Sequence, residues 1–164
     1  MKLQVESNAV NVMVRPTRIP ARIIFPEGED THAKKVVRKP NHSHVFKFHS
    51  GKCQRVIDLN SRLEYARARM LEMDPDVISF EVKPFQIEYA DEGIVKSMFP
   101  DLLVHRRDGS KTIEEVMTAK KAAFPLFKRL VAIERVILAK HGYQFQVVTE
   151  EDLRDPLGYA RSKS

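Results

Sequence analysis

The sequence of 164 residues has few cysteines, few glycines and no long apolar run, and each shortage excludes a class of protein or site. A single cysteine, Cys53, rules out an internal disulfide, which fits a reducing compartment and makes the cytoplasm the expected location. Six scattered glycines exclude a glycine-rich loop that cradles phosphates, and no Walker-type ATP-binding motif is present. No apolar run reaches the roughly 18 residues of a membrane span, and we expect no signal peptide. The remaining composition, 43% hydrophobic and 30% charged, is typical of a globular protein.

The net charge of +6 is unevenly distributed along the chain. Residues 1–62 contain 12 lysines and arginines against 5 acidic residues, whereas residues 63–164 contain 16 against 17. A basic segment before a neutral one suits a polyanionic partner, most simply nucleic acid, although a solubilising basic tail would have the same composition. The basic side chains expected to contact DNA phosphates are Arg38, Lys39, Lys47, Lys52, Arg55 and Lys83.

The chain is expected to have three segments. They are a basic, largely extended arm over 1–43 with a short strand at 22–25, a folded domain over 44–154, and a flexible tail over 155–164. The expected elements of the domain are strands over 44–50, 53–59, 77–82, 85–89, 101–106, 111–117 and 143–148, helices over 61–73 and 120–140, and a short helix that begins in 149–152. This order predicts one α/β domain in which helices flank a mixed central sheet.

The segment "RDGS", residues 107–110, predicts a β-hairpin between two of these strands. If its first three residues form the loop, with the glycine left-handed, Asp101 lies opposite Glu115. Their Cβ atoms would then be about 4.5–5.5 Å apart on one face. Two such carboxylates repel unless a cation lies between them, and Mg²⁺ takes oxygen ligands of this kind. A two-residue turn would put them on opposite faces, and either acid could be an ordinary strand residue.

Several stretches, in order, resemble the TnsA endonuclease subunit of heteromeric cut-and-paste transposons over roughly residues 45–154. They are a serine and a glutamate that open a helix in "NSRLEYARARMLEM", then "DPDV", "KPFQI", "FPDLLV", "IEEVM" and "TEEDLR". The resemblance implies a restriction-endonuclease-like fold. It also implies a Mg²⁺-dependent DNA endonuclease, in which Mn²⁺ is the expected substitute.

The resemblance assigns roles to individual residues. It makes Asp101 and Glu115 metal ligands, and it makes Glu64 a third ligand contributed by the first helix. Glu64 has a second interpretation, because with Ser61 it forms an S-x-x-E capping box that accounts for it at a helix start. The catalytic lysine of the family falls on Met117, where the sequence departs from the pattern.

A thioether cannot supply the fixed positive charge that such a lysine provides. Three lysines are candidates for a relocated charge: Lys120, Lys121 and Lys83. Lys120 is the preferred catalytic candidate because it lies three residues beyond Met117. Lys83 stands where relatives usually carry glutamine. A second metal ion could also replace the lysine, or the site could be degenerate and retained for its shape.

Two functions of different classes follow. As an enzyme, the chain would cleave the 5′ strands at transposon ends, together with a partner transposase subunit that cuts and joins the 3′ ends and an ATP-dependent regulator. As a binding protein, it would be a DNA-docking or assembly subunit without cleavage. An unrelated nuclease-fold protein of phage or restriction origin is a weaker third interpretation. No membrane partner is expected, and a homodimer is left open.

Overall fold

The structure, a computed structural model, describes residues 20–26 and 45–153. Most of the arm expected over 1–43 and all of the tail expected over 155–164 therefore lie outside the described residues. The described residues form nine strands and three helices. Their bounds are β1 Ala21–Ile24, β2 Phe46–Ser50, β3 Arg55–Leu59, α1 Arg62–Met73, β4 Val77–Val82, β5 Gln86–Asp91, β6 Ile94–Met98, β7 Leu102–Arg106, β8 Lys111–Val116, α2 Ala119–Ala123, α3 Pro125–Lys140 and β9 Gln144–Val148.

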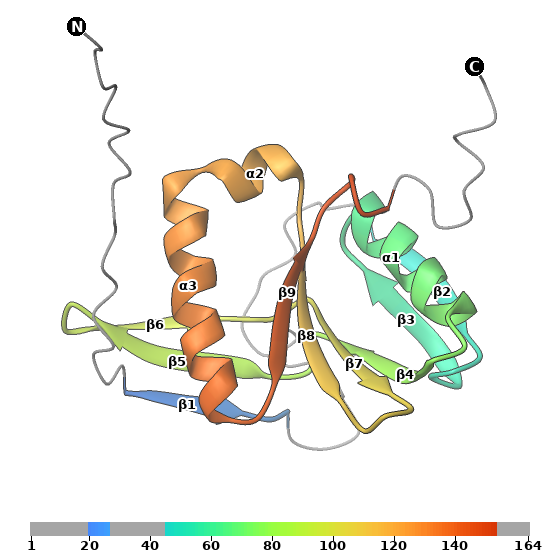
Figure 1. The fold of residues 1–164 in the computed structure, drawn as a ribbon, viewed down its shortest axis with the longest axis horizontal. Coiled ribbons are helices and arrows are strands. Elements are labelled where there is room, and N and C mark those ends of the chain that lie inside the picture. Colours follow the sequence, from blue (N-terminus) through green and yellow to red (C-terminus); the bar gives the residue numbers. More distant parts are fainter. Residues whose placement is uncertain (1–19, 27–44, 154–164) are drawn as a thin grey trace, which may run out of the picture.

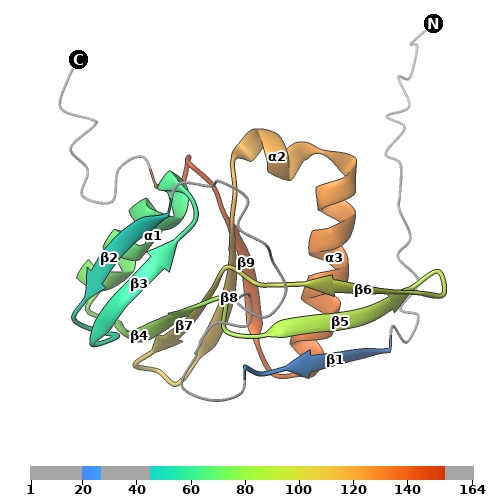
Figure 2. The same cartoon turned by 180° about the vertical axis from the view of Figure 1, so that it is seen from behind.

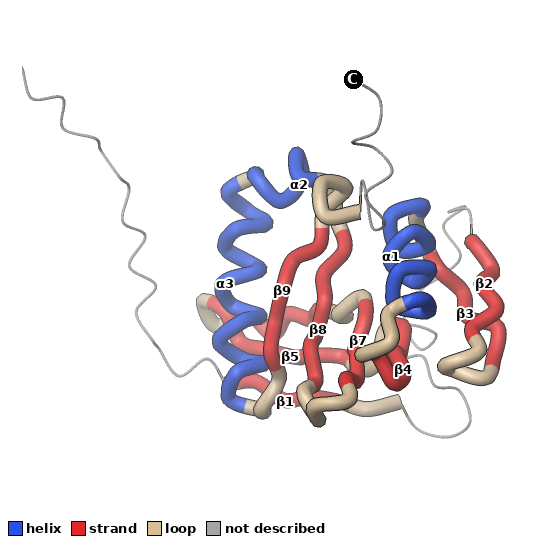
Figure 3. The backbone as a smooth tube through the Cα atoms, turned by 45° about the vertical axis from the view of Figure 1, so that its right-hand side comes forward, coloured by secondary structure: helices blue, strands red, loops and turns tan. Residues whose placement is uncertain are grey.

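A mixed four-stranded sheet in the order β4-β7-β8-β9 forms the middle layer (Figure 1). β4, β7 and β8 are antiparallel neighbours, and β9 runs parallel to β8. α1 and the β2-β3 hairpin cover one side, while α3 and the three-stranded sheet β1-β5-β6 cover the other (Figure 2). Figure 3 shows α1 and α3 on opposite sides of β8 and β9. The expected mixed α/β class is confirmed, but the strands form three sheets rather than one.

Alternation along the β7-β8 hairpin directs neighbouring side chains into two separate cores. Leu102 and Val104 pack in the core that contains α1, whereas Leu103 packs in the core that contains α3. In β8, Val116 belongs to the first core and Ile113 to the second. Even-numbered residues of the hairpin therefore face α1, and odd-numbered residues face α3.

α1 begins and ends where the sequence predicts. Ser61 is its N-cap, and the Ser61 Oγ accepts a hydrogen bond from the Glu64 backbone N–H at 3.0 Å. The Glu64 carboxylate in turn accepts a hydrogen bond from the Asn60 N–H at 2.8 Å, which satisfies a second free donor at the helix start. The helix stops at Asp74, because Pro75 disfavours a helical conformation in the residue before it.

β6 is not predicted by the sequence analysis. Its first residues, Ile94 and Val95, are exposed, so the strand has no alternating apolar pattern that would reveal it. The turn expected over 90–93 does form, and Glu92 and Gly93 have φ values of 52° and 79°. Two positive φ values match the twist of a two-residue hairpin, and this turn pairs β6 with β5.

The single helix expected over 120–140 is instead two helices, α2 and α3. Phe124 adopts an extended conformation between them, with φ −66° and ψ 137°, because Pro125 follows it. Pro125 then occupies the first turn of α3, where its missing N–H has no cost. Residues 151–153 form a turn rather than part of the expected short helix. None of the helices in the described ranges is long and apolar enough to span a membrane.

Candidate active site

The β7-β8 hairpin has the register that the sequence predicts. Arg106 and Ser110 close a three-residue loop through the Arg106 N–H and the Ser110 carbonyl at 3.1 Å. Gly109 has a φ of 85°, a left-handed conformation that favours glycine. Leu102 pairs with Glu114. Continuing that register by one residue beyond β7 aligns Asp101 with Glu115.

Asp101 lies directly beside β8 and is held by both of its carboxylate oxygens. Its Oδ2 accepts a hydrogen bond from the Val116 N–H at 2.8 Å, and its Oδ1 forms an ion pair with the Lys83 Nζ. The Lys83 N–H also donates to the Asp101 carbonyl at 2.9 Å. Asp101 and Lys83 are only 9% and 5% exposed, so this ion pair is buried.

The Glu115 carboxyl meets a second carboxyl, that of Glu134 on α3. Glu134 is 4% exposed, and its Oε1 is buried without a hydrogen-bond partner. A buried oxygen of this kind costs free energy, and such groups are rare in folded proteins. The pair is therefore an incompletely satisfied polar cluster inside the protein.

Burial, and then the neighbouring Glu134 carboxyl, raise the pKa of Glu115 to about 8, while the charges of Lys83 and Lys121 oppose the shift. Burial also raises the pKa of Glu134 to about 7, against the hydrogen bond from Glu115 and the charge of Lys83. Because the two groups interact, they lose their protons as a pair. Near neutral pH, and without another cation, the pair therefore retains a proton that two ordinary glutamates would have lost.

A cavity of about 160 Å³ opens beside this pair. Met117 lines it, on the same face as Glu115, as the sequence analysis expects. Lys121, from the start of α2, lies at the same cavity, and its Nζ is 4.5 Å from the centroid of the Phe127 ring. The remaining lining residues are Tyr89, Ser97, Met98, Phe99, Phe127, Leu130 and Val131.

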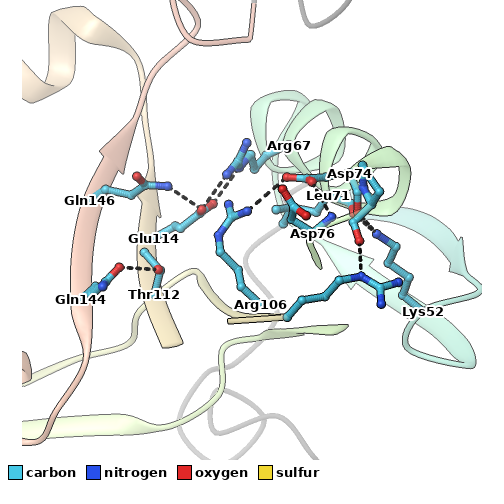
Figure 4. Close-up of polar contacts among 12 residues, drawn as sticks. Lys52, Arg67, Leu71, Asp74, Asp76, Arg106, Thr112, Glu114, Gln144 and Gln146 are labelled. Atoms are coloured by element: carbon cyan, nitrogen blue, oxygen red, sulfur yellow. Dashed lines mark hydrogen bonds and ion pairs between the residues drawn. The ribbon is translucent and has the colours of Figure 1, made fainter. Parts of the chain in front are cut away.

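The opposite face of β8 holds a different arrangement. Glu114 is fully buried and accepts two hydrogen bonds from the Arg67 guanidinium, at 2.7 and 2.6 Å. Gln146 on β9 donates to the same carboxylate at 2.6 Å. Figure 4 shows Arg67 approaching from α1 and Gln146 from β9. Glu114 is thus a paired structural carboxylate with no access to the cavity beside Glu115.

A family model described as TnsA-like endonuclease N terminal matches residues 74–150. This match supports a TnsA-like nuclease domain in the chain. No curated protein matches the chain. The matched segment includes Asp101, Glu115, Met117 and Glu134, but it begins after α1 and so leaves out Glu64. The mixed α/β architecture, with its several sheets and three helices among the described residues, is compatible with a nuclease-like fold.

Glu64, which the resemblance makes a metal ligand of the TnsA-like domain, is buried at the start of α1. Its backbone N–H donates to the Ser61 Oγ, as the capping-box interpretation requires, while its carboxylate accepts from the Asn60 N–H, one residue before the N-cap. Within the described ranges, no three His, Cys, Asp or Glu side chains gather as a ready metal site. The hairpin register therefore aligns Asp101 with Glu115, and Glu64 does not join them in such a group.

The candidate lysines differ in position. Lys120 and Lys121 are exposed on α2, and of these two only Lys121 lines the cavity. Lys83 is the buried one, and it acts electrostatically on Glu115 as well as pairing with Asp101. The ammonium nearest the carboxylates is therefore that of Lys83, not of Lys120.

The basic residues expected to contact DNA are only partly at the surface. Lys47 is exposed and pairs with Asp58 at 3.0 Å. Lys52 donates to the carbonyls of Leu71, at 2.9 Å, and of Asp74, and so stabilises the end of α1. Lys83 is buried, which removes it from the surface set. Arg55 is partly buried, and Arg38 and Lys39 lie outside the described residues.

Glu134 is the residue that sequence reasoning missed. It lies among the apolar positions of α3, with Leu130 one turn before it and Ile137 and Leu138 one turn after it. A glutamate at such a position is unusual, because charged side chains are almost never buried unless they are paired. The periodicity of α3 therefore contained a signal for Glu134, although it could not name Glu115 as the neighbour.

The donor set beside the cavity suits a hard divalent cation. It consists of carboxylate oxygens, including the unpartnered Glu134 Oε1, and the lining residues include no thiolate or imidazole. Mg²⁺ is often held by only one or two carboxylates, with water and substrate phosphate oxygens in its remaining positions. The residues present thus fit Mg²⁺ or Mn²⁺ better than a soft metal ion.

Proposed function

We propose that this chain is the metal-dependent DNA endonuclease subunit of a transposase, and that it hydrolyses phosphodiesters in the 5′ strands at transposon ends. The observation that carries the proposal is the buried Asp101–Lys83 ion pair, together with the half-buried Glu115 on which Lys83 acts, in the segment that matches the TnsA-like family model. Clustered groups with strongly shifted pKa values next to a cavity are typical of catalytic sites.

In the proposed site, Asp101 and Glu115 hold Mg²⁺, or Mn²⁺ in its place. When bound, the ion favours deprotonation of the attacking water and neutralises charge on the phosphate. Hydrolysis joins the water oxygen to phosphorus and breaks the bond from phosphorus to the leaving sugar oxygen. The proton lost by the water is balanced by one that the leaving oxygen gains from solvent. Asp101 is kept in position by the Val116 N–H, so its orientation does not depend on the substrate.

The proposed partners are double-stranded DNA, a transposase subunit that processes the 3′ ends and an ATP-dependent regulator. The uneven charge of the chain supports a DNA partner, because the first 62 residues contain the whole excess of basic residues. Exposed Lys47 belongs to this basic part of the chain.

The experiment that tests this function measures nicking of a supercoiled plasmid that carries the transposon ends. The full chain, together with the transposase subunit isolated in complex with it, is assayed with and without Mn²⁺. We expect cleavage only with the metal ion, and a loss of about 10²–10³ in rate for Asp101→Asn, which keeps the size of the side chain. Asp58→Ala, which removes an exposed carboxylate, is the control and should cleave like the wild type.

A second candidate, an assembly subunit that docks on DNA without cleaving it, is favoured by two observations. Met117 puts a thioether at the cavity, and both oxygens of Asp101 are already engaged by Lys83 and Val116. The same assay distinguishes the two functions. A wild type that binds DNA in the complex but cleaves no more than Asp101→Asn would support the assembly subunit.

A further inference from the structure

Lys83 is a buried ammonium among acidic side chains from three different elements. It pairs with Asp101, which precedes β7, and it acts electrostatically on Glu115 of β8 and Glu134 of α3. Lysine is almost never buried unless it is paired, since removing an ammonium from water is costly. The Lys83 ammonium thus pairs directly with one carboxylate and lies within electrostatic reach of two further carboxyl groups.

The backbone at Lys83 is held in an uncommon conformation. Its φ is 48°, in the left-handed region that residues with a Cβ avoid. The strain is held from both sides, because the Lys83 N–H bonds to the Asp101 carbonyl and buried Phe85 anchors the following residues in the second core. Strain of this kind persists only where the surrounding structure enforces it, and it concentrates at functional sites.

We propose that Lys83 supplies the fixed positive charge of the active site, acting electrostatically on the scissile phosphodiester while its ammonium stays paired with Asp101. The inference rests on the proposed function and identifies one of its working residues. The charge then comes from the connection between β4 and β5, and not from β8, where Met117 presents an uncharged thioether to the cavity. A fixed ammonium favours hydrolysis because negative charge on the phosphate oxygens is stabilised most where donors are already in position.

The two lysines of α2 are weaker candidates for this role. Lys120 and Lys121 are exposed, so water and salt screen their charges. The Lys121 ammonium also lies over the Phe127 ring, at the cavity rather than beside Asp101. The field of a buried ammonium is screened much less, which makes Lys83 the stronger source of positive charge at the site.

The position of Met117 allows the charge to be moved within the site. Because Met117 lines the cavity beside Glu115, a lysine introduced there would face the same carboxylates. The test compares the wild type with Lys83→Gln, with the double variant Lys83→Gln/Met117→Lys and with Lys120→Gln. Lys140→Gln, in the last turn of α3, is the matched control for losing an exposed lysine. Each full chain is assayed with its transposase partner for nicking of the plasmid in Mn²⁺, and kcat and KM are measured separately.

We expect Lys83→Gln to lower kcat by about 10²–10³ with little change in the KM for DNA, because the charge acts on the transition state. The double variant should recover at least about tenfold of that loss. Lys120→Gln and Lys140→Gln should cleave like the wild type. Glutamine is chosen at position 83 because it keeps an N–H donor for Asp101. Thermal unfolding of each variant verifies that the fold is retained.

The outcomes separate the inference from the function on which it rests. Cleavage by Lys83→Gln within a few-fold of the wild type would overturn the role of Lys83 and leave the endonuclease standing. An equal loss in Lys120→Gln, or a folded double variant that recovers nothing, would also overturn it. A wild type that cleaves no more than Asp101→Asn would overturn both proposals together. If Lys83→Gln fails to fold, the double variant decides: folded and active supports the role, folded and inactive overturns it.

Discussion

Glu114 and Glu115 are neighbours in β8, yet their side chains face opposite sides of the sheet and meet opposite surroundings. On the α1 side, Glu114 receives two hydrogen bonds from Arg67 and one from Gln146. On the α3 side, Glu115 meets another carboxyl, Glu134, beside a cavity. The protein supplies Glu114 with positively charged and amide donors, whereas it places a second acidic group beside Glu115.

The difference in surroundings is the basis for assigning Glu114 a structural role and for proposing a functional one for Glu115. A buried carboxylate that is fully paired holds two elements in one arrangement, here α1 against β8. A carboxyl group that faces a like group keeps a raised pKa and an unsatisfied oxygen nearby, and such perturbed groups cluster at functional sites. Substitutions can test whether the two roles are as distinct as the contacts indicate.

The largest effect on stability is expected at Glu114. Glu114→Ala leaves the partly buried Arg67 guanidinium without its partner, and breaking a buried pair in this way costs about 3–5 kcal/mol. Urea unfolding of the variant measures the loss. The double variant Glu114→Met/Arg67→Leu should recover most of it, because neither buried charge remains. A loss below about 1 kcal/mol in Glu114→Ala would contradict a structural role for this pair.

The counterpart at Glu115 should affect cleavage instead of stability. Glu115→Gln removes a charge from the proposed metal site and should lower the cleavage rate by about 10²–10³ in Mn²⁺. Its free energy of unfolding without metal should not fall, because a neutral amide relieves the contact with Glu134. The cleavage rate and the free energy of unfolding should be measured on one preparation, so that Glu115→Gln can be compared directly with Glu114→Ala. A variant that is unstable but cleaves normally would reverse the roles assigned to the two glutamates.

On the α3 side, the Glu115–Glu134 pair should make stability depend on pH. The pKa values of Glu115 and Glu134 rise from 4.5 to about 8 and about 7 on folding. Between these limits the folded state binds more protons than the unfolded state, so stability falls as pH rises from about 5 to 8. In Glu134→Gln this fall should be smaller, by an amount on the order of 2 kcal/mol at pH 8. Urea unfolding of the wild type and of Glu134→Gln at pH 5 and pH 8, without metal, measures this difference. An equal loss of stability between the two pH values in both proteins would refute the shared burial of Glu115 and Glu134.

The smallest effect is expected at Glu64, the buried glutamate of α1. Glu64→Gln keeps an oxygen that can accept the hydrogen bond from the Asn60 N–H, so stability should change by less than about 1 kcal/mol. Cleavage should stay within a few-fold of the wild type, since the contacts of Glu64 are those of a helix cap. Thermal unfolding and the plasmid assay measure the two quantities. A loss as large as that of Glu115→Gln would instead support Glu64 as a metal ligand.

Local rules predict the parts of this site that depend on nearby residues. The "RDGS" turn sets the register of the hairpin, and with it the approach of Asp101 to Glu115. The capping box sets the start of α1. The acid on α3 and the burial of Lys83 depend on tertiary packing, because Glu134 is brought to Glu115 only after the chain breaks at Phe124 and returns along the sheet.

Three features of the fold differ from the sequence prediction: strand β6, the break between α2 and α3, and the division into three sheets. β6 carries exposed apolar residues on an edge, so alternation gives no indication of it. The split between α2 and α3 follows from the restriction that Pro125 imposes on the backbone of Phe124. The prediction of one continuous helix did not take this restriction into account. The division into three sheets depends on which strands pair, and β1 joins β5 from a distant part of the chain.

That pairing has a consequence for the order in which the molecule folds. The β7-β8 hairpin closes over three residues, whereas β1 and β5 pair positions about 65 residues apart, so β1 pays a larger loop-closure entropy. β1 should therefore join after the hairpins have formed. Until it does, one side of β5 carries unpaired N–H and C=O groups that can recruit a strand from another molecule. Once β1 has joined, it forms the edge of that sheet itself, and its four residues offer a shorter template to another chain than the six residues of β5.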